Sequence, residues 1–202
     1  MLAIIDYGGG NLGSLVAALH RRGARFAITD DGATLAQADA AVLPGDGAFG
    51  ATMQALAQRG LDSAILEHVS AGKPFLGICV GMQILFEDSD EFGVCAGLAI
   101  LQGRVSRFVS APRVPHMGWN DLEITSQHPF VEGLGAQPYA YFLHSYRAAV
   151  GPDTVAACTH GERFSAIVAR GNVMGTQFHP EKSQRTGAKL LDNFLHLSGE
   201  VG

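Results

Sequence analysis

Short apolar runs alternate with segments of helical periodicity through the first half of the chain. The apolar runs predict strands at residues 2–6, 26–29, 40–43 and 74–78. Apolar residues at helical spacing predict helices at residues 12–22, 51–59 and 61–70, and the start of another at 82–86. Alternating strands and helices are typical of a parallel sheet that carries helices on both faces.

The second half of the chain is richer in strand patterns. Short runs separated by turn residues predict strands at residues 98–108, 119–125, 139–144, 154–159, 165–170 and 173–178. Residues 113–120, which contain the only tryptophan, are expected to form an irregular loop, and residues 184–197 a closing helix. The expected fold is therefore α/β, with a mainly parallel central sheet flanked by helices and additional antiparallel strands in the C-terminal half.

Length and composition indicate the size of the domain and disfavour several classes of partner. A chain of 202 residues with 47% hydrophobic content predicts a single domain, residues 1–202, with a sizeable core. The net charge of -5 and the absence of a basic run disfavour nucleic acid and anionic membrane surfaces as partners. No apolar run reaches the roughly 20 residues that span a bilayer, and the first residues lack a charged-then-apolar leader. Three sparse cysteines without a disulfide or metal-pair pattern fit a reducing cytoplasm.

The strand at 74–78 runs directly into the predicted helix through Cys79, with Gly77 two residues before it and Gly81 two residues after. This is the Gly-x-nucleophile-x-Gly elbow, with cysteine in place of serine. A sharp strand-to-helix turn strains the central residue, so its neighbours must lack side chains. A helix N-terminus favours a thiolate. The alternative is a buried structural cysteine in an ordinary turn.

Two glycine-rich loops, residues 7–11 and 44–50, also follow predicted strands. Ligands of parallel sheets bind outside the carboxyl ends of the strands, so both loops should converge with Cys79 on one site. The first resembles a phosphate cradle only weakly, and Asn11 can equally cap a helix. The second could donate backbone N–H groups to an oxyanion, or be a plain turn.

His179 and Glu181 come directly after the last predicted strand, with Pro180 between them. A thiol nucleophile needs a base that takes and returns its proton, and the base needs a carboxylate that fixes its tautomer. A surface histidine beside a solvated glutamate is the alternative for this pair alone. Together with the cysteine elbow, the pair favours a catalytic triad.

These motifs resemble those of the class I glutamine amidotransferases, and among them the glutaminase subunits of histidine biosynthesis. The resemblance rests on the elbow at 77–83, the His-Pro-Glu run at 179–181, and further runs at 6–12, 43–49, 115–120, 144–146 and 177–183. The Pro-His-Met-Gly-Trp-Asn run at 115–120 is the most specific of them. The implied fold is the flavodoxin-like fold of that family.

The resemblance implies a Cys-His-Glu mechanism without a cofactor or metal. Cys79 attacks the side-chain amide of glutamine, His179 shuttles the proton, Glu181 orients His179, and a glutamyl thioester forms. Further roles follow by matching motifs. The substrate-binding residues are Gly45, Gln83, Ser145 and Tyr146, and the oxyanion donors are Gly47 and Val80. Asp46 stands where this loop often carries an apolar residue, and is expected to point outward.

The resemblance also implies a partner. The chain is too short to hold a (β/α)₈ barrel of about 250 residues as well, so the ammonia acceptor is expected to be a separate barrel cyclase subunit in a heterodimer. That subunit forms imidazole glycerol phosphate and an aminoimidazole carboxamide ribonucleotide. The residues expected to face it are Asn11, Met117, Trp119, Asn120 and Lys182.

Three other interpretations remain at this point. A cysteine peptidase or amidase could use a related elbow, although the His-Pro-Glu order and Gln83 speak against it. A non-catalytic flavodoxin-like binding module would not need the base–carboxylate pair. A glutaminase subunit could also serve another synthase.

Overall fold

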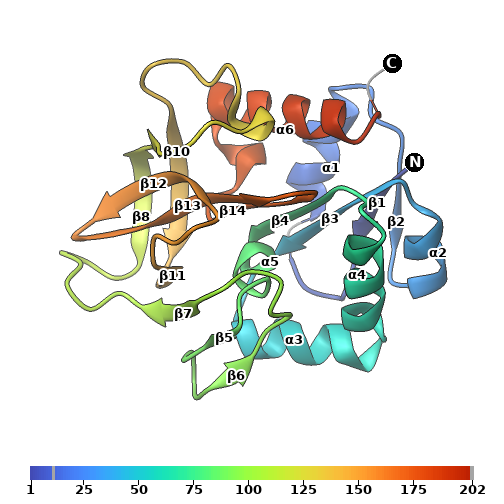
Figure 1. Ribbon diagram of the computed structural model, residues 1–202, viewed down its shortest axis with the longest axis horizontal. Helices are drawn as coiled ribbons and strands as arrows, with labels where there is room; N and C mark the ends of the chain where they lie inside the picture. Colours follow the sequence, from blue (N-terminus) through green and yellow to red (C-terminus); the bar gives the residue numbers. More distant parts are fainter. Residues whose placement is uncertain (11, 201–202) are drawn as a thin grey trace.

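A computed structural model describes residues 1–10 and 12–200 of the chain (Figure 1). Its central sheet has eight strands in the order β2-β1-β3-β4-β14-β13-β12-β9. The first five strands are parallel to one another: β2 (Phe26–Thr29), β1 (Leu2–Ile5), β3 (Ala40–Gly45), β4 (Phe75–Cys79) and β14 (Val173–Thr176). The last three continue antiparallel: β13 (Glu162–Arg170), β12 (Thr154–His160) and β9 (Glu123–Ile124).

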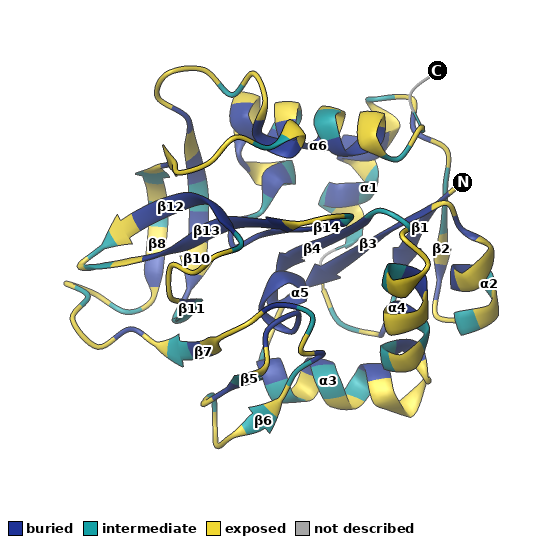
Figure 2. Ribbon diagram, in the orientation of Figure 1, coloured by how far each residue is buried: buried dark blue, intermediate teal, exposed yellow. Residues whose placement is uncertain are grey.

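Helices cover both faces of the parallel part of this sheet. In Figure 1, α1 (Leu12–His20) and α6 (Gln184–Leu197) lie on one side, and α3 (Phe49–Gln58) and α4 (Leu61–Ser70) on the other. The short α2 (Gly32–Gln37) packs against α4. Every residue of β1, β3 and β4 is buried (Figure 2). Strands covered on both faces read as continuous apolar runs, which is why the sequence shows them clearly.

Two smaller sheets stand beside the antiparallel end. One pairs β8 (His116–Asp121) with β10 (Tyr139–His144). The other has the order β11-β7-β5-β6, formed by β11 (Tyr146–Ala148), β7 (Arg104–Arg107), β5 (Asp88–Ser89) and β6 (Cys95–Ala96). Single helical turns complete the fold: α5 (Val80–Gln83), η1 (Pro129–Val131) and η2 (Pro180–Lys182).

The expected fold class is confirmed, while several local expectations are wrong. Residues 113–120 are not an irregular loop throughout, because His116 begins strand β8. Of residues 98–108, Arg104–Arg107 alone form a strand. The elbow helix is one turn at Val80–Gln83 rather than a helix that starts at 82. Helix α2 was not expected; it begins after Asp31, whose carboxylate accepts a hydrogen bond from the N–H of Thr34 at 2.9 Å.

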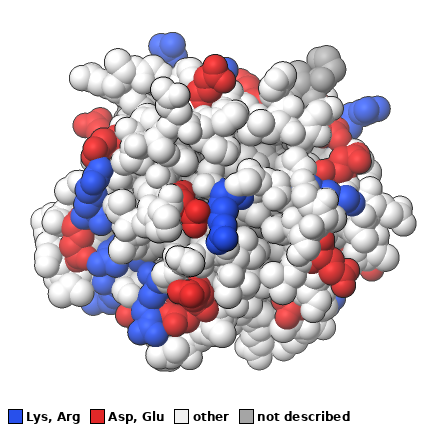
Figure 3. Space-filling view, viewed as in Figure 1, with Lys and Arg blue, Asp and Glu red and all other residues white. Residues whose placement is uncertain are grey.

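The topology brings the expected site loops together. Parallel β1, β3, β4 and β14 all end at the same edge of the sheet, where the loops at 6–10, 45–49, Cys79 and 177–181 follow. Among the described residues, no helix is long and apolar enough to cross a membrane. Acidic and basic side chains are intermingled on the face shown in Figure 3.

Candidate active site

Cys79 stands at the junction of β4 and α5 with φ 55° and ψ −113°. A positive φ is strained for a residue with a side chain, so the surroundings must hold it. A Cβ on Gly77 would lie 2.3 Å from the carbonyl oxygen of Gly81, and a Cβ on Gly81 would lie 2.1 Å from that of Leu43. Neither position can accept a side chain, which confirms the steric role predicted for both glycines. The turn leaves Cys79 5% exposed.

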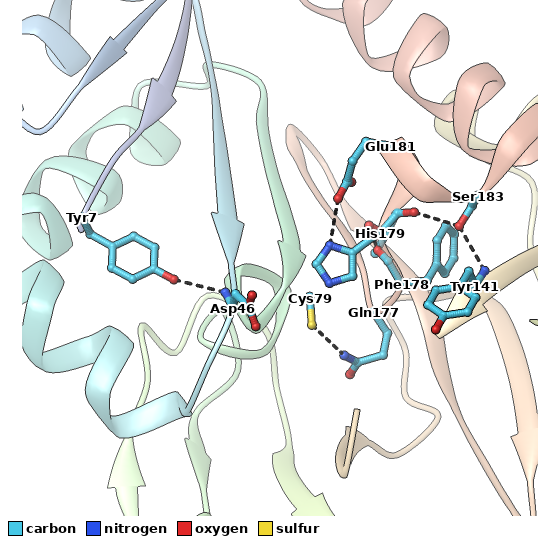
Figure 4. A network of polar contacts seen from close by, with 10 residues as sticks. Tyr7, Asp46, Cys79, Tyr141, Gln177, Phe178, His179, Glu181 and Ser183 are labelled. Carbon is cyan, nitrogen blue, oxygen red and sulfur yellow. Dashed lines mark hydrogen bonds and ion pairs between the residues drawn. The ribbon is translucent and has the colours of Figure 1, made fainter. Parts of the chain in front are cut away.

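His179 and Glu181 reach the thiol from the loop after β14. Nδ1 of His179 lies 3.0 Å from Oε1 of Glu181, which is almost fully buried. A carboxylate only accepts, so Nδ1 carries a proton. The opposite edge of the ring faces Cys79 (Figure 4). Burial of the ring favours its neutral form, but the hydrogen bonds and charges of Cys79 and Glu181 outweigh burial and raise the pKa of His179 to about 10.

A cavity of about 300 Å³ opens beside the thiol. Its lining residues come from the loop after β3, the elbow, the β5–β6 connection, the residue before β8 and the β10–β11 segment: Asp46, Gly47, Cys79, Val80, Gln83, Glu91, Pro115, Leu143, His144, Ser145 and Tyr146. The cavity therefore contains the predicted nucleophile, both predicted oxyanion residues and three of the four predicted substrate-binding residues. Gly45 is not among the lining residues, and it packs so closely on α5 that a Cβ there would stand 2.4 Å from the N of Gly81.

Gln83 is held by two hydrogen bonds inside this wall. Its Nε2 donates to the carbonyl oxygen of Tyr146 and to Oε1 of Gln177, each at 3.0 Å. Gln177 in turn places its Nε2 3.9 Å from Sγ of Cys79. With both N–H bonds of Gln83 committed, the side chain can offer a ligand its oxygen as an acceptor.

In the loop after β3, the backbone N–H of Asp46 is directed at the hydroxyl of Tyr7, at 3.4 Å. Figure 4 places that contact on the side away from Cys79. Gly47 has φ +106°, a conformation that residues with side chains rarely adopt. The Asp46 side chain is exposed and borders the cavity.

The residues predicted to face a partner lie in different settings. Met117 and Trp119 are exposed on β8, and Lys182 is exposed on η2. Asn120 differs from the expectation, because its amide turns inward and donates to the carbonyl oxygen of Thr159 at 2.9 Å and to His116. Its alternation with Trp119 along β8 explains this, since successive side chains of a strand point to opposite faces. Asn11 lies outside the described residues.

Sequence reasoning missed four residues of this region. Tyr7, Gln177 and His144 contact predicted site residues directly, and Glu91 lines the cavity with its carboxylate accepting from the N–H of Phe49 at 2.7 Å. Three of the four lie inside or beside the motifs on which the resemblance rests. Glu91 sits in a run of acidic residues that reads as a solvated surface, so no local pattern marked it.

Comparison with known proteins identifies the family. The family model described as glutamine amidotransferase class-I matches residues 3–197. Imidazole glycerol phosphate synthase subunit HisH of Salinibacter ruber is 47% identical over 206 residues, covering 98% of this chain and 94% of that protein. The same subunit of Syntrophotalea carbinolica is 47% identical, covering 96% of this chain and 98% of that protein.

The fold agrees with that result. A solved structure described as glutamine amidotransferase has a TM-score of 0.77 at 22% identity and covers 98% of each chain. The chain belongs to the class I glutamine amidotransferases, a class of enzymes. Within that class it belongs to the family of imidazole glycerol phosphate synthase subunits HisH.

Proposed function

We propose that this chain hydrolyses glutamine to glutamate and passes the ammonia to a partner subunit of imidazole glycerol phosphate synthase, for histidine biosynthesis. The observation that carries the proposal is that His179 lies between Cys79 and Glu181 (Figure 4), with Cys79 in the wall of a cavity. The identity to the HisH subunits over nearly the whole chain supports the choice of synthase.

The first half of the reaction uses the charge state of His179. A thiol attacks as its thiolate, and the raised pKa of His179 keeps the neighbouring ring protonated at neutral pH. The sulfur of Cys79 attacks the side-chain carbonyl carbon of glutamine and forms the C–S bond. His179 then gives a proton to the leaving nitrogen, the C–N bond breaks, and ammonia departs from a glutamyl thioester.

The second half regenerates the enzyme. Neutral His179 now takes a proton from water, whose oxygen attacks the thioester carbonyl carbon. The C–S bond breaks, glutamate leaves, and the sulfur regains its negative charge beside a protonated ring. Glu181 keeps Nδ1 of His179 protonated in both halves, so the other ring nitrogen always faces the reaction.

The substrate's amino-acid end needs an acceptor for its ammonium group and donors for its carboxylate. Glu91 and the oxygen of Gln83 supply negative and partial negative charge in the cavity wall. We assign the backbone of Gly45, Ser145 and Tyr146 to the same end of the substrate. The backbone N–H groups of Val80 and of the Asp46–Gly47 segment are assigned to the oxyanion.

The partner is proposed to be a separate (β/α)₈-barrel cyclase subunit, which forms a heterodimer with the single domain at residues 1–202. Met117, Trp119 and Lys182 offer exposed side chains for that contact. Asn11 stays in this set by resemblance alone. The cytoplasm is the proposed compartment, in keeping with free Cys79, Cys95 and Cys158.

The test is glutamate release by triad variants assembled with the cyclase subunit. Cys79→Ala should abolish hydrolysis and His179→Ala should nearly do so, because each removes a group that makes or breaks bonds. Glu181→Gln should retain the most activity of the three, because an orienting residue is the least costly member to lose.

Cys95→Ala is the matched control, since Cys95 lies on β6 and contacts no triad residue in its hydrogen bonds. It should hydrolyse glutamine like the wild type. A panel of dipeptides in the same assay separates a glutaminase from a peptidase. Wild-type turnover by Cys79→Ala, or faster cleavage of dipeptides than of glutamine, would contradict the proposed glutaminase function.

A further inference from the structure

Three hydrogen-bonded side chains join strand β8 to the wall of the glutamine cavity. Nδ2 of Asn120 lies 3.2 Å from Nε2 of His116, and Nδ1 of His116 lies 3.0 Å from Nε2 of His144. Nδ1 of His144 then lies 2.8 Å from the carbonyl oxygen of Tyr146. His116 and His144 are 3% and 7% exposed. The mechanism above uses neither histidine.

The carbonyl at one end fixes the direction of these bonds. A carbonyl only accepts, so Nδ1 of His144 carries the hydrogen. Burial lowers the pKa of His144 to about 3, and burial together with the nearby His160 lowers that of His116 to about 4. Both rings are neutral and have one N–H each. The bare Nε2 of His144 therefore accepts from Nδ1–H of His116, whose own bare Nε2 accepts from Asn120.

The far end of the chain is fixed as well. The amide of Asn120 donates to the carbonyl oxygen of Thr159 at 2.9 Å, and its Oδ1 accepts from the N–H of Asp121 at 2.9 Å. The amide cannot flip without losing these partners. Every N–H therefore points from β8 toward Tyr146, and no member can reverse alone.

Packing holds the rings in this arrangement. The ring of His116 is stacked between His160, at 4.2 Å between centroids, and Phe142, at 4.7 Å. Phe164 stands edge-on to His144 at 5.0 Å. His160 itself bonds to the carbonyl oxygen of Arg113 at 2.7 Å and makes no hydrogen bond in the chain from Asn120 to Tyr146.

The carbonyl that receives this chain also orients Gln83. It accepts from His144 on one side and from Nε2 of Gln83 on the other. The second N–H of Gln83 goes to Gln177, which also approaches Cys79. The position of one carbonyl thus helps to fix the amide of Gln83, a residue of the cavity wall.

We infer that His144 and His116 are positioning residues of the glutaminase, which fix the Tyr146 carbonyl and through it the glutamine-binding oxygen of Gln83. The inference rests on the proposed function. It also gives β8 a place in the site. Strand β8 turns Met117 and Trp119 outward and His116 and Asn120 inward. A partner bound to the outer face of β8 would therefore contact the strand in which the hydrogen-bond chain begins, at Asn120.

Two substitutions at His144 separate the effect of its N–H donor from the effect of its side-chain volume. His144→Asn keeps an N–H near the place of Nδ1, while His144→Phe fills the same space among aromatic rings without a donor. The Phe variant should raise the KM for glutamine about tenfold, because the Tyr146 carbonyl loses one of its two donors and no longer holds the amide of Gln83 in a fixed place. Its kcat should change less, because Gln83 contacts ground and transition states alike. The Asn variant should raise KM by about threefold or less.

His160→Gln is the control for the aromatic cluster, since it alters the ring stacked on His116 but no bond of the chain. Its KM should stay at the wild-type value. All rates are measured with the cyclase subunit present. An equal KM in wild type and His144→Phe, or an equal rise in His144→Phe and His160→Gln, would overturn the inference. A wild-type complex that does not hydrolyse glutamine would instead overturn the proposed function.

Nitrogen-15 spectra of histidine-labelled protein give a readout that does not depend on activity. At pH 7, His116 and His144 should both show a protonated Nδ1 and a bare Nε2, assigned from the spectra of His116→Asn and His144→Asn. A protonated Nε2 or a doubly protonated ring at either position would refute the direction of the chain.

Discussion

At the scale of single residues, His179 has two neighbours that oppose the effect of burial on its pKa: burial lowers the pKa, and both neighbours raise it. Cys79 and Glu181 face opposite edges of the ring, and both favour its charged form. The raised pKa of His179 means that the ring is already protonated at neutral pH before glutamine binds. The arrangement stores the acid needed for the leaving nitrogen on the correct atom.

This leads to a prediction about titration. The pKa of His179 is raised to about 10, so the ring should stay charged through neutral pH and become neutral only as pH rises through about 10. Cys79→Ala removes a partner that raises the pKa, while burial, which lowers it, remains. The pKa of His179 should therefore fall in that variant, and also in Glu181→Gln. Histidine-resolved nuclear magnetic resonance between pH 5 and about 11 measures it. An unchanged pKa in both variants would contradict the ion pair.

At the scale of elements, a contact with Tyr7 holds the loop after β3 in one arrangement. The N–H of Asp46 points at Tyr7, and Gly47 has the positive φ that the loop needs here. Tyr7 is fixed from both sides, because it is 3% exposed and a Cβ on Gly9 would stand 2.6 Å from its ring. Rotation of the Asp46 peptide would turn its N–H from the phenol toward the oxyanion.

Tyr7→Phe should accordingly raise the glutaminase rate of the isolated subunit. It deletes the acceptor that holds the Asp46 N–H away from the thiol and keeps the ring. One oxyanion donor is worth about a hundredfold in rate, so a several-fold rise is expected from partial release. Gly47→Ala should act in the same direction, because alanine is strained at φ +106°.

The measurement compares subunit alone, subunit with cyclase, and the complex with its acceptor ligand. The ratio between the last and first rates should shrink in Tyr7→Phe, while the fully activated rate stays near the wild-type value. A lower rate in all three conditions would instead give Tyr7 a plain structural role.

The elements also show what the sequence could predict. The cysteine elbow was predictable because its constraint is local: Gly77 and Gly81 exclude side chains within one turn. Strand β8 was predicted only in part, from residue 119, and its first residues were assigned to a loop, because its pairing partner, β10, lies far along the chain and one of its faces is exposed. The contacts of Gln177 with Gln83 and of Tyr7 with Asp46 were equally beyond local patterns, because each joins separate strands.

At the scale of the whole molecule, one face of the β8–β10 sheet is left uncovered next to the active site. The outward residues pair across the strands as Met117 with Leu143 and Trp119 with Tyr141. Met117 is 62% exposed and Leu143, which also borders the cavity, 44%. Aromatic and methionine side chains gathered on one exposed face are typical of protein interfaces. A partner on this face would lie beside the cavity that Leu143 borders.

Trp119→Ala therefore tests the docking face. Trp119 is 46% exposed and packs edge-on against Tyr139 and Tyr141 at 5.4 and 5.8 Å. Its loss should weaken binding of the cyclase subunit by about thirtyfold, the size of an interface hot spot of roughly 2 kcal/mol. The melting temperature of the isolated subunit should fall little, because half of the ring already faces solvent. Calorimetric titration measures the affinity, and thermal unfolding measures the melting temperature.

The matched control is Ile28→Ala, which removes a 49% exposed side chain from strand β2 at the opposite edge of the main sheet. It should leave the affinity for the cyclase subunit unchanged. Unchanged affinity with a large loss of stability in Trp119→Ala would make the tryptophan part of the core and place the docking face elsewhere.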